Sequence, residues 1–157
     1  MRVIDDSIIK PLPSDELIKK LENVWRIIFP QSYKDFIKIN NGCVPFEKII
    51  NCNGRKYVVD RFLCILDSPE GHEFGVYDID VILTQIEDRL TDNEDLVGVE
   101  LLPIIQLFAG DYICLDFKND KGKVTVCLWS HEESGDLEPV TYFIANNFES
   151  FIEMLVE

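Results

Sequence analysis

Residues 103–129 read PIIQLFAGDYICLDFKNDKGKVTVCLW and contain three apolar runs, Pro103–Phe108, Asp111–Phe117 and Lys123–Trp129. Two short links, Ala109-Gly110 and Asn119-Asp120-Lys121-Gly122, separate these runs. Links this short, rich in Gly and Asn, typically join neighbouring antiparallel strands. The stretch therefore predicts three consecutive antiparallel strands.

The middle run indicates how this sheet is covered. Ile113, Leu115 and Phe117 share one face of a strand, while the positions on the side of Tyr112 and Cys114 share the other. Alternation of this kind is typical of a sheet that packs on one face and meets water on the other. We therefore expect the sheet to be covered mainly on one face.

The chain on either side adds strands. From Val44 the residues are of β type around the turn signal Asn51-Cys52-Asn53-Gly54, which predicts a hairpin into Arg55–Leu66. After the central runs, a last strand near Val140–Ile144 leads to Asn146-Asn147. The closing helix predicted next bears Phe148, Phe151, Ile152 and Leu155.

The N-terminal part predicts two helices. Ser14 can cap the first, in which apolar residues recur at helical spacing as one stripe until Pro30 stops the helix. The members of that stripe are Leu17, Leu21, Val24, Trp25 and Ile28. A second, short helix carries Tyr33, Phe36 and Ile37 on one side, and Asn41-Gly42 terminates it.

The middle of the chain predicts a loop and a third helix. Residues 67–76 contain one Pro and two Gly, which is typical of a loop. Asp78 or Asp80 can cap a helix that reaches about Leu90, and the acidic stretch Thr91–Glu100 connects it to the central strands. We therefore expect a single α+β domain over residues 1–157, with its core at about 14–157 and helices packed around a largely antiparallel sheet.

Length and composition agree with one globular domain. The 157 residues are 46% hydrophobic and 11% aromatic, which is typical of a folded chain of one-domain size. No apolar stretch approaches the ~20 residues that span a bilayer, and the start lacks a signal-peptide core. We expect a cytoplasmic protein with reduced core thiols, zinc binding being the less favoured alternative, because no Cys-x-x-Cys pair is present. The five cysteines are Cys43, Cys52, Cys64, Cys114 and Cys127.

The charged residues are distributed unequally along the sequence. Residues 1–66 hold eleven Lys/Arg against eight Asp/Glu, whereas residues 67–157 hold four against twenty-one, a balance of −17. A surface of this sign repels nucleic acid and anionic membranes and attracts a cationic partner. The charge is equally explained by an acidic, soluble surface that has no partner.

The acidic residues are densest in two regions. Residues 67–100 contain eleven Asp/Glu and one base, Arg89, and a second acidic turn spans residues 131–138. Crowded carboxylates repel one another, so their presence hints at a partner that carries Lys or Arg. The predicted partner-binding residues are Glu70, Glu73, Asp78, Asp80, Glu87, Asp88, Asp92, Glu94, Asp95, Glu132, Glu133, Asp136 and Glu138.

Motifs for common catalytic and cofactor sites are missing from the sequence. His72 and His131 lie outside any His-Glu-x-x-His pattern, and no phosphate-binding glycine loop, nucleophile elbow or calcium loop occurs. Glu132 and Glu133 could serve acid–base chemistry, but adjacent side chains on a turn diverge. We expect no cofactor, no metal site and no enzymatic activity.

Three segments resemble signatures of the SUKH superfamily, whose members carry Smi/Knr-type domains. Residues 29–42, FPQSYKDFIKINNG, resemble its opening helix, which ends in Asn-Gly. Residues 110–117, GDYICLDF, with residues 124–129, VTVCLW, and His131-Glu132 resemble its second signature. Residues 147–152, NFESFI, resemble its closing helix, so the resemblance runs from about residue 14 to the end.

The resemblance implies an α+β fold and non-enzymatic protein binding. Most bacterial members look like immunity proteins that neutralise polymorphic toxins, many of them nucleases, and a fungal branch regulates cell-wall synthesis. The favoured hypothesis is an immunity protein that blocks a cationic toxin domain through its acidic surface. The alternative is an intracellular scaffold or regulatory module that binds a cellular protein.

Overall fold

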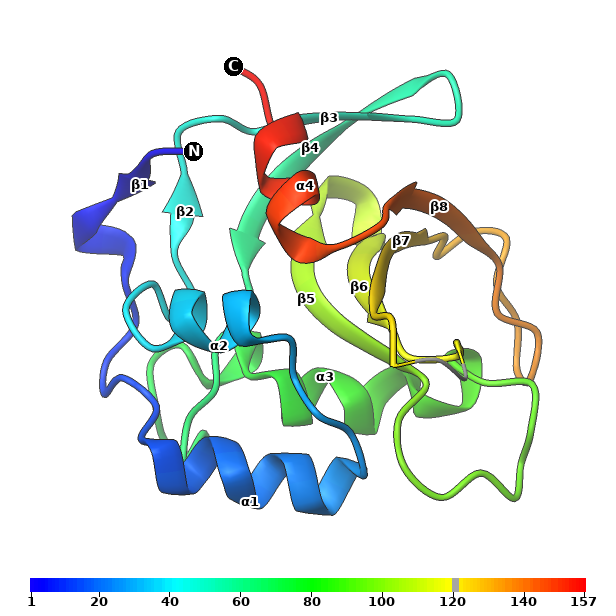
Figure 1. Cartoon of the computed structure of the whole chain (residues 1–157), viewed down its shortest axis with the longest axis horizontal. Helices are drawn as coiled ribbons and strands as arrows, with labels where there is room; N and C mark the ends of the chain where they lie inside the picture. Colours follow the sequence, from blue (N-terminus) through cyan, green and yellow to red (C-terminus); the bar gives the residue numbers. More distant parts are fainter. Residues whose placement is uncertain (120–121) are drawn as a thin grey trace.

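The computed structural model describes residues 1–119 and 122–157, and its central element is a six-stranded antiparallel sheet in chain order, β3-β4-β5-β6-β7-β8 (Figure 1). The α+β prediction is thereby confirmed. The predicted turn at residues 119–122 includes 120 and 121, which lie outside the described residues. The strands are β3 (Ile49–Cys52), β4 (Arg55–Phe62), β5 (Leu101–Leu107), β6 (Tyr112–Asp116), β7 (Thr125–Trp129) and β8 (Thr141–Ala145).

The predicted first hairpin is present. Asn53 and Gly54 join β3 to β4 with φ angles of 51° and 73°, which is the two-residue type I′ geometry that Asn-Gly favours. A separate two-stranded sheet pairs β1 (Val3–Ile4) with β2 (Val44–Pro45). It fastens the N-terminus beside the segment that enters the main sheet.

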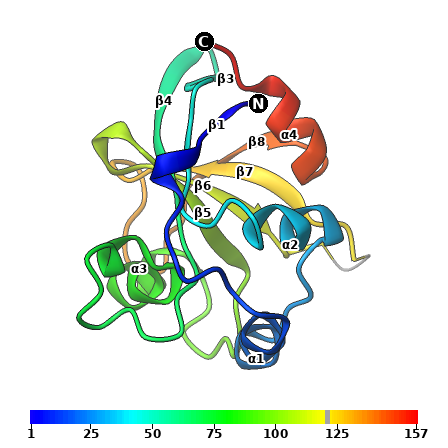
Figure 2. The same cartoon turned by 90° about the vertical axis from the view of Figure 1, so that its left-hand side faces the viewer.

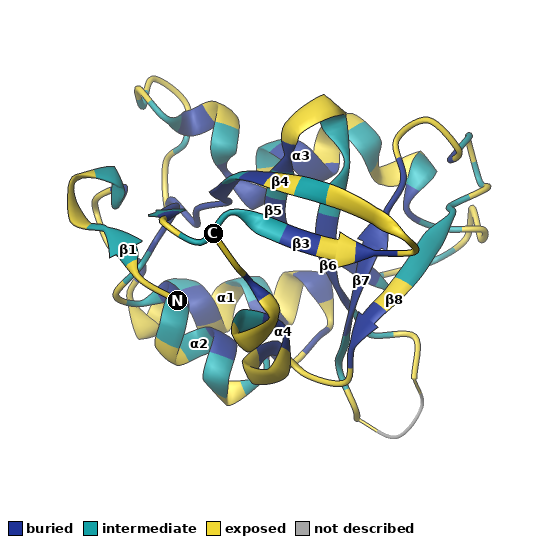
Figure 3. Cartoon of the chain, turned by 90° about the horizontal axis from the view of Figure 1, so that it is seen from above, coloured by how far each residue is buried: buried dark blue, intermediate teal, exposed yellow. Residues whose placement is uncertain are grey.

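The sheet is covered on both faces, so the prediction of one covered face was wrong. Three successive β6 residues, Ile113, Cys114 and Leu115, are each 0% exposed, although neighbours along a strand point to opposite faces. Helix α3 (Ile79–Ile86) lies on one side, and α2 (Gln31–Ile37) and α4 (Phe148–Met154) lie on the other (Figure 2). Figure 3 shows the resulting contrast between the buried central strands and the exposed β3–β4 hairpin.

Helix α1 (Asp15–Trp25) begins at the predicted cap, Ser14, but it ends before Pro30. Arg26 takes a left-handed conformation with φ 56°, and the N–H groups of Arg26 and Ile27 both bond to the carbonyl of Glu22. This left-handed C-cap ends the helical periodicity. The predicted stripe is corrected at two positions: Ile28, beyond this cap, is 76% exposed, and Val24, within the helix but off its buried side, is 61% exposed.

The buried face of α1 is held to α2 through a carboxylate. Glu22, Ile18 and Trp25 are the buried residues of α1. The Glu22 carboxylate accepts a hydrogen bond from the Phe29 N–H at 2.9 Å and lies 3.2 Å from the Lys34 ammonium. A buried carboxylate needs such partners, and together they fix the direction in which the chain enters α2.

Candidate protein-binding surface

Asp78 is the buried N-cap of α3, which corrects its predicted place among the partner-facing residues. Its side chain is 2% exposed and accepts hydrogen bonds from the N–H groups of Asp80 at 2.9 Å, Val81 at 3.2 Å and Leu66 at 2.8 Å. Burial raises the pKa of this carboxyl, although the three hydrogen bonds favour the ionised form. The Asp78 carboxylate therefore caps α3 and links the helix to the backbone of Leu66.

Replacement of Asp78 by Ala is expected to lower the free energy of unfolding by about 2 kcal/mol, because the helix loses its cap and the Leu66 N–H is left buried without an acceptor. The control is Asp80→Ala, two residues along at an exposed position, where the loss should stay within about 0.5 kcal/mol. Urea unfolding followed by circular dichroism measures both. Equal losses would contradict the capping role.

The remaining predicted residues are exposed, and those of residues 67–100 lie before α3, on it at Asp80, and after it. Glu70 and Glu73 lie in the loop that precedes α3, whereas the run from Glu87 to Asp95 follows its C-terminal end (Figure 1). The short helix Glu87–Arg89 continues α3 directly. The exposed residues are Glu70, Glu73, Asp80, Glu87, Asp88, Asp92, Glu94, Asp95, Glu132, Glu133, Asp136 and Glu138.

The two acidic regions meet at the C-terminal end of α3. The Leu137 N–H donates to the carbonyl of Asp88 at 2.7 Å. The Arg89 guanidinium donates to the carbonyls of His131 at 2.5 Å and Ser134 at 2.8 Å, so it fastens the second acidic turn to the first region. Sequence alone could not place these segments together, since more than 40 residues separate Arg89 from His131.

Arg89 also packs on the sheet. Its guanidinium lies 5.0 Å from the centre of the Trp129 ring, and the indole N–H donates to the Arg89 carbonyl at 2.9 Å. Asp111 completes the arrangement by accepting a hydrogen bond from the His131 N–H at 2.7 Å. Trp129, Asp111 and His131 all belong to the second signature, which thus positions the acidic turn.

The carboxylates here have few internal partners. The ion pairs of the described residues use the acidic groups of Asp15, Glu22, Glu47 and Glu157, none of which belongs to the predicted surface. Arg89 donates to carbonyl groups and a ring, so no described ion pair joins it to these acids. Glu133 accepts a hydrogen bond from the Tyr142 hydroxyl. The negative potential of the surface is therefore largely uncompensated within the described part of the chain.

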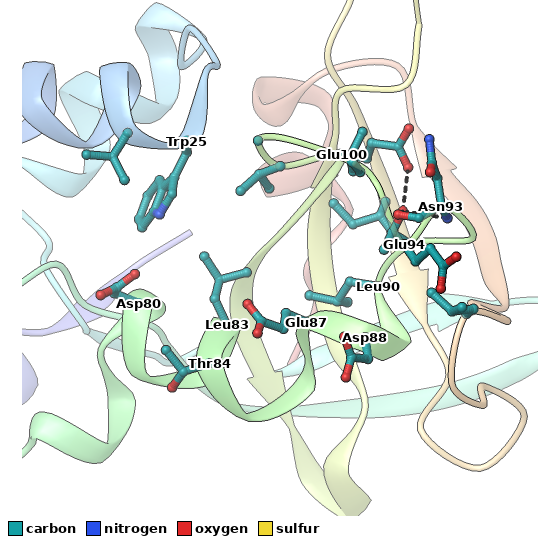
Figure 4. Close-up of a pocket in the computed structure, with 17 residues that line it drawn as sticks. Trp25, Asp80, Leu83, Thr84, Glu87, Asp88, Leu90, Asn93, Glu94 and Glu100 are labelled. Carbon is teal, nitrogen blue, oxygen red and sulfur yellow. Dashed lines mark hydrogen bonds between the residues drawn. The ribbon is translucent and has the colours of Figure 1, made fainter.

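A groove of about 480 Å³ opens beside this surface (Figure 4). Its floor includes Trp25, Leu83 and Leu90, and Figure 4 shows Trp25 across from Asp80 and Glu87. Five acidic residues line it, of which Glu100 was absent from the predicted set: Asp80, Glu87, Asp88, Glu94 and Glu100. Trp25 and Val24 were also missed, because their helical spacing indicated only core.

The histidines and cysteines have structural positions. The Nε2 atom of His72 lies 2.7 Å from the carbonyl of Lys10, and Nδ1 of His131 lies 3.2 Å from the Arg89 guanidinium. All five cysteines are free and buried, as predicted, and burial raises the pKa of the Cys43, Cys64 and Cys127 thiols to about 12. Such thiols are inert as nucleophiles at neutral pH.

The His, Cys, Asp and Glu side chains of residues 1–119 and 122–157 do not gather into a metal centre. Within these ranges, no three His, Cys, Asp or Glu side chains are grouped so that they could hold a metal ion. No helix of the same ranges has the length and apolar character needed to cross a membrane.

Comparison with known proteins identifies a family for this chain. The family model SUKH_6, described as SMI1-KNR4 cell-wall, matches residues 15–152. The matched range includes α1, the whole six-stranded sheet and both acidic regions. No curated protein and no solved structure matches the chain.

Proposed function

Because the chain belongs to the SMI1-KNR4 family of SUKH domains, which are generally non-enzymatic protein-binding modules, we propose that it is a cytoplasmic immunity protein that neutralises a cationic toxin domain. The observation that carries the proposal is the adjoining pair of acidic regions, fastened by Arg89 and lacking ion-pair partners in the described part of the chain. The acidic surface covers the active site or the substrate groove of the toxin.

Electrostatics explains why a nuclease toxin suits this surface. A nuclease is basic where it holds phosphates, so carboxylates on a rigid surface can occupy the same groove. Desolvated charge pairs at such an interface hold the complex together, and charges at its rim raise the association rate. Arg89 and Trp129 supply the rigidity, since they fix the second acidic turn to the sheet.

The test uses the toxin encoded beside the gene and a paired charge reversal. Glu87→Lys with Glu94→Lys is expected to slow association with that toxin by about 10- to 100-fold at low salt, because steering by the acidic surface is lost. The matched control reverses Glu149 and Glu153, which are exposed on α4, and should change the rate less than about twofold. Stopped-flow fluorescence measures the rates.

Two outcomes separate the parts of the proposal. Association that is unchanged by Glu87→Lys with Glu94→Lys and insensitive to salt would remove the acidic-surface mechanism and leave immunity standing. Failure of the protein to bind the neighbouring toxin or to protect cells that produce it would overturn immunity itself.

The second candidate is an intracellular regulatory module that binds a cellular protein. The family description, SMI1-KNR4 cell-wall, favours it. Gene neighbourhood separates the two candidates, because an adjacent toxin gene supports immunity and a solitary locus supports regulation.

A further inference from the structure

The groove beside the acidic surface combines two kinds of wall. The accessible apolar side chains of its lining include Val24, Leu96 and Val99, over a floor of the nearly buried Trp25, Leu83 and Leu90. Carboxylates come from Asp80, Glu87, Asp88, Glu94 and Glu100. None of the described residues that line the groove is Lys or Arg. An occupant must therefore offer apolar surface to the floor and positive charge to the walls.

The chain builds the groove by holding the 91–100 segment against the end of α1. The Val99 N–H donates to the Trp25 carbonyl at 3.0 Å. Gly98 has φ +113°, and a Cβ atom there would lie 2.9 Å from the Trp25 carbonyl oxygen, so only glycine permits this approach. The groove is thus formed by the fold itself and does not depend on an occupant.

Exposed apolar side chains border this contact. Val24, which lines the groove, is 61% exposed, and Val97, next to Gly98, is 65% exposed. The volume of about 480 Å³ lies within the range of roughly 300–1,000 Å³ over which protein sites hold ligands. It is large enough for an apolar side chain and the backbone that carries it.

We infer that the groove receives a segment of the partner protein in which an apolar anchor side chain is flanked by Lys or Arg. The inference rests on the proposed function and adds the chemistry of the contact to it. The anchor packs on Val24 and Val99 above the nearly buried Trp25, and the flanking cations meet Glu87 and Glu94 at the walls. An apolar centre with basic neighbours is the one segment chemistry that complements both sets of lining residues.

Three synthetic peptides and two variants test the inference without a natural partner. One peptide has a Leu-Trp-Leu centre flanked by lysines, the second has the same lysines around a Ser-Gly-Ser centre, and the third has the apolar centre flanked by glutamates. Thr84→Arg places a cation in the groove, whereas Gln85→Arg makes a similar charge change at an exposed neighbour that does not line it. Peptides are titrated into isotopically labelled protein, with the Leu83 and Val99 amides as NMR reporters.

The lysine peptide with the apolar centre is expected to bind at least about tenfold more tightly than either other peptide. The Ser-Gly-Ser peptide loses the burial of the apolar anchor, and the glutamate peptide is repelled by the carboxylates of the groove. Thr84→Arg should weaken it about tenfold, and Gln85→Arg by less than about twofold. Equal affinity of the two lysine peptides, equal effects of the two variants, or no binding of the first peptide would overturn the groove inference. None of these results bears on whether the neighbouring toxin binds, which the charge reversal tests separately.

Discussion

Replacement of Asn41 by Ala is expected to lower the free energy of unfolding by about 3–4 kcal/mol, because several buried backbone groups lose their partner at once. Asn41 is 0% exposed. Its amide nitrogen donates to the carbonyls of Ile9 at 3.2 Å and Ile65 at 3.1 Å, and its amide oxygen accepts from the Ile65 N–H at 2.8 Å. One side chain thus joins the N-terminal segment, the end of the α2 region and the chain that follows β4.

Urea unfolding at neutral pH measures this loss, with Asn23→Ala as the control. Asn23 is exposed on α1, so its replacement should change the free energy of unfolding by no more than about 0.5 kcal/mol. A loss at Asn41 as small as at Asn23 would mean that water replaces the amide and that the junction is not held by this residue.

Asn41 also shows how far the sequence could predict the fold. Asn41-Gly42 was predicted to terminate a short helix, but α2 ends four residues before Asn41, at Ile37, and its C-cap is Lys38. The hairpin turn at Asn53-Gly54 was predicted correctly, because turns and caps depend on residues that adjoin in the sequence. The contact of the Asn41 side chain with Ile65 joins residues 24 positions apart, and no local pattern encodes that distance.

The two wrong predictions about packing have a common cause. The predicted stripe placed Val24 and Ile28 in the core, but the buried side of α1 is that of Ile18, Glu22 and Trp25, and Ile28 lies beyond the left-handed Arg26. The expectation of one covered face assumed that Tyr112 and Cys114 face water, whereas Cys114 is fully buried. Both depend on which elements pack on a segment, which periodicity does not reveal.

For the candidate site, too, local features were predicted from the sequence and contacts between distant segments were not. The sequence identified the acidic regions and a cap at Asp78 or Asp80, since density of charge and capping are local properties. It could not show that Asp78 is buried, that Arg89 fastens the two regions together, or that Trp25 forms the floor of a groove. Each of these results from segments that meet only in the folded chain.

Gly42→Ala is expected to lower the free energy of unfolding by about 2–4 kcal/mol, through backbone strain together with overpacking. Gly42 has φ +63°, and a Cβ atom there would lie 2.4 Å from Cδ1 of Ile9 and 3.0 Å from Cβ of Cys64. Ile9 is 1% exposed, so its side chain has little room to move away. Steric crowding should therefore add to the cost of the left-handed conformation.

Gly54→Ala supplies the matched control for Gly42→Ala. Gly54 has a similar φ of +73°, but no atom lies within 4 Å of the position of its Cβ, so the loss there should be about 1 kcal/mol, the cost of the backbone conformation alone. Ile9→Val removes the atom nearest to the added methyl group and should recover part of the Gly42→Ala loss in a double-mutant cycle. Equal losses at Gly42 and Gly54, or a cycle without coupling, would assign the whole effect to backbone strain, whereas coupling between residues 9 and 42 would show that close packing of the N-terminal segment is what requires glycine at this position.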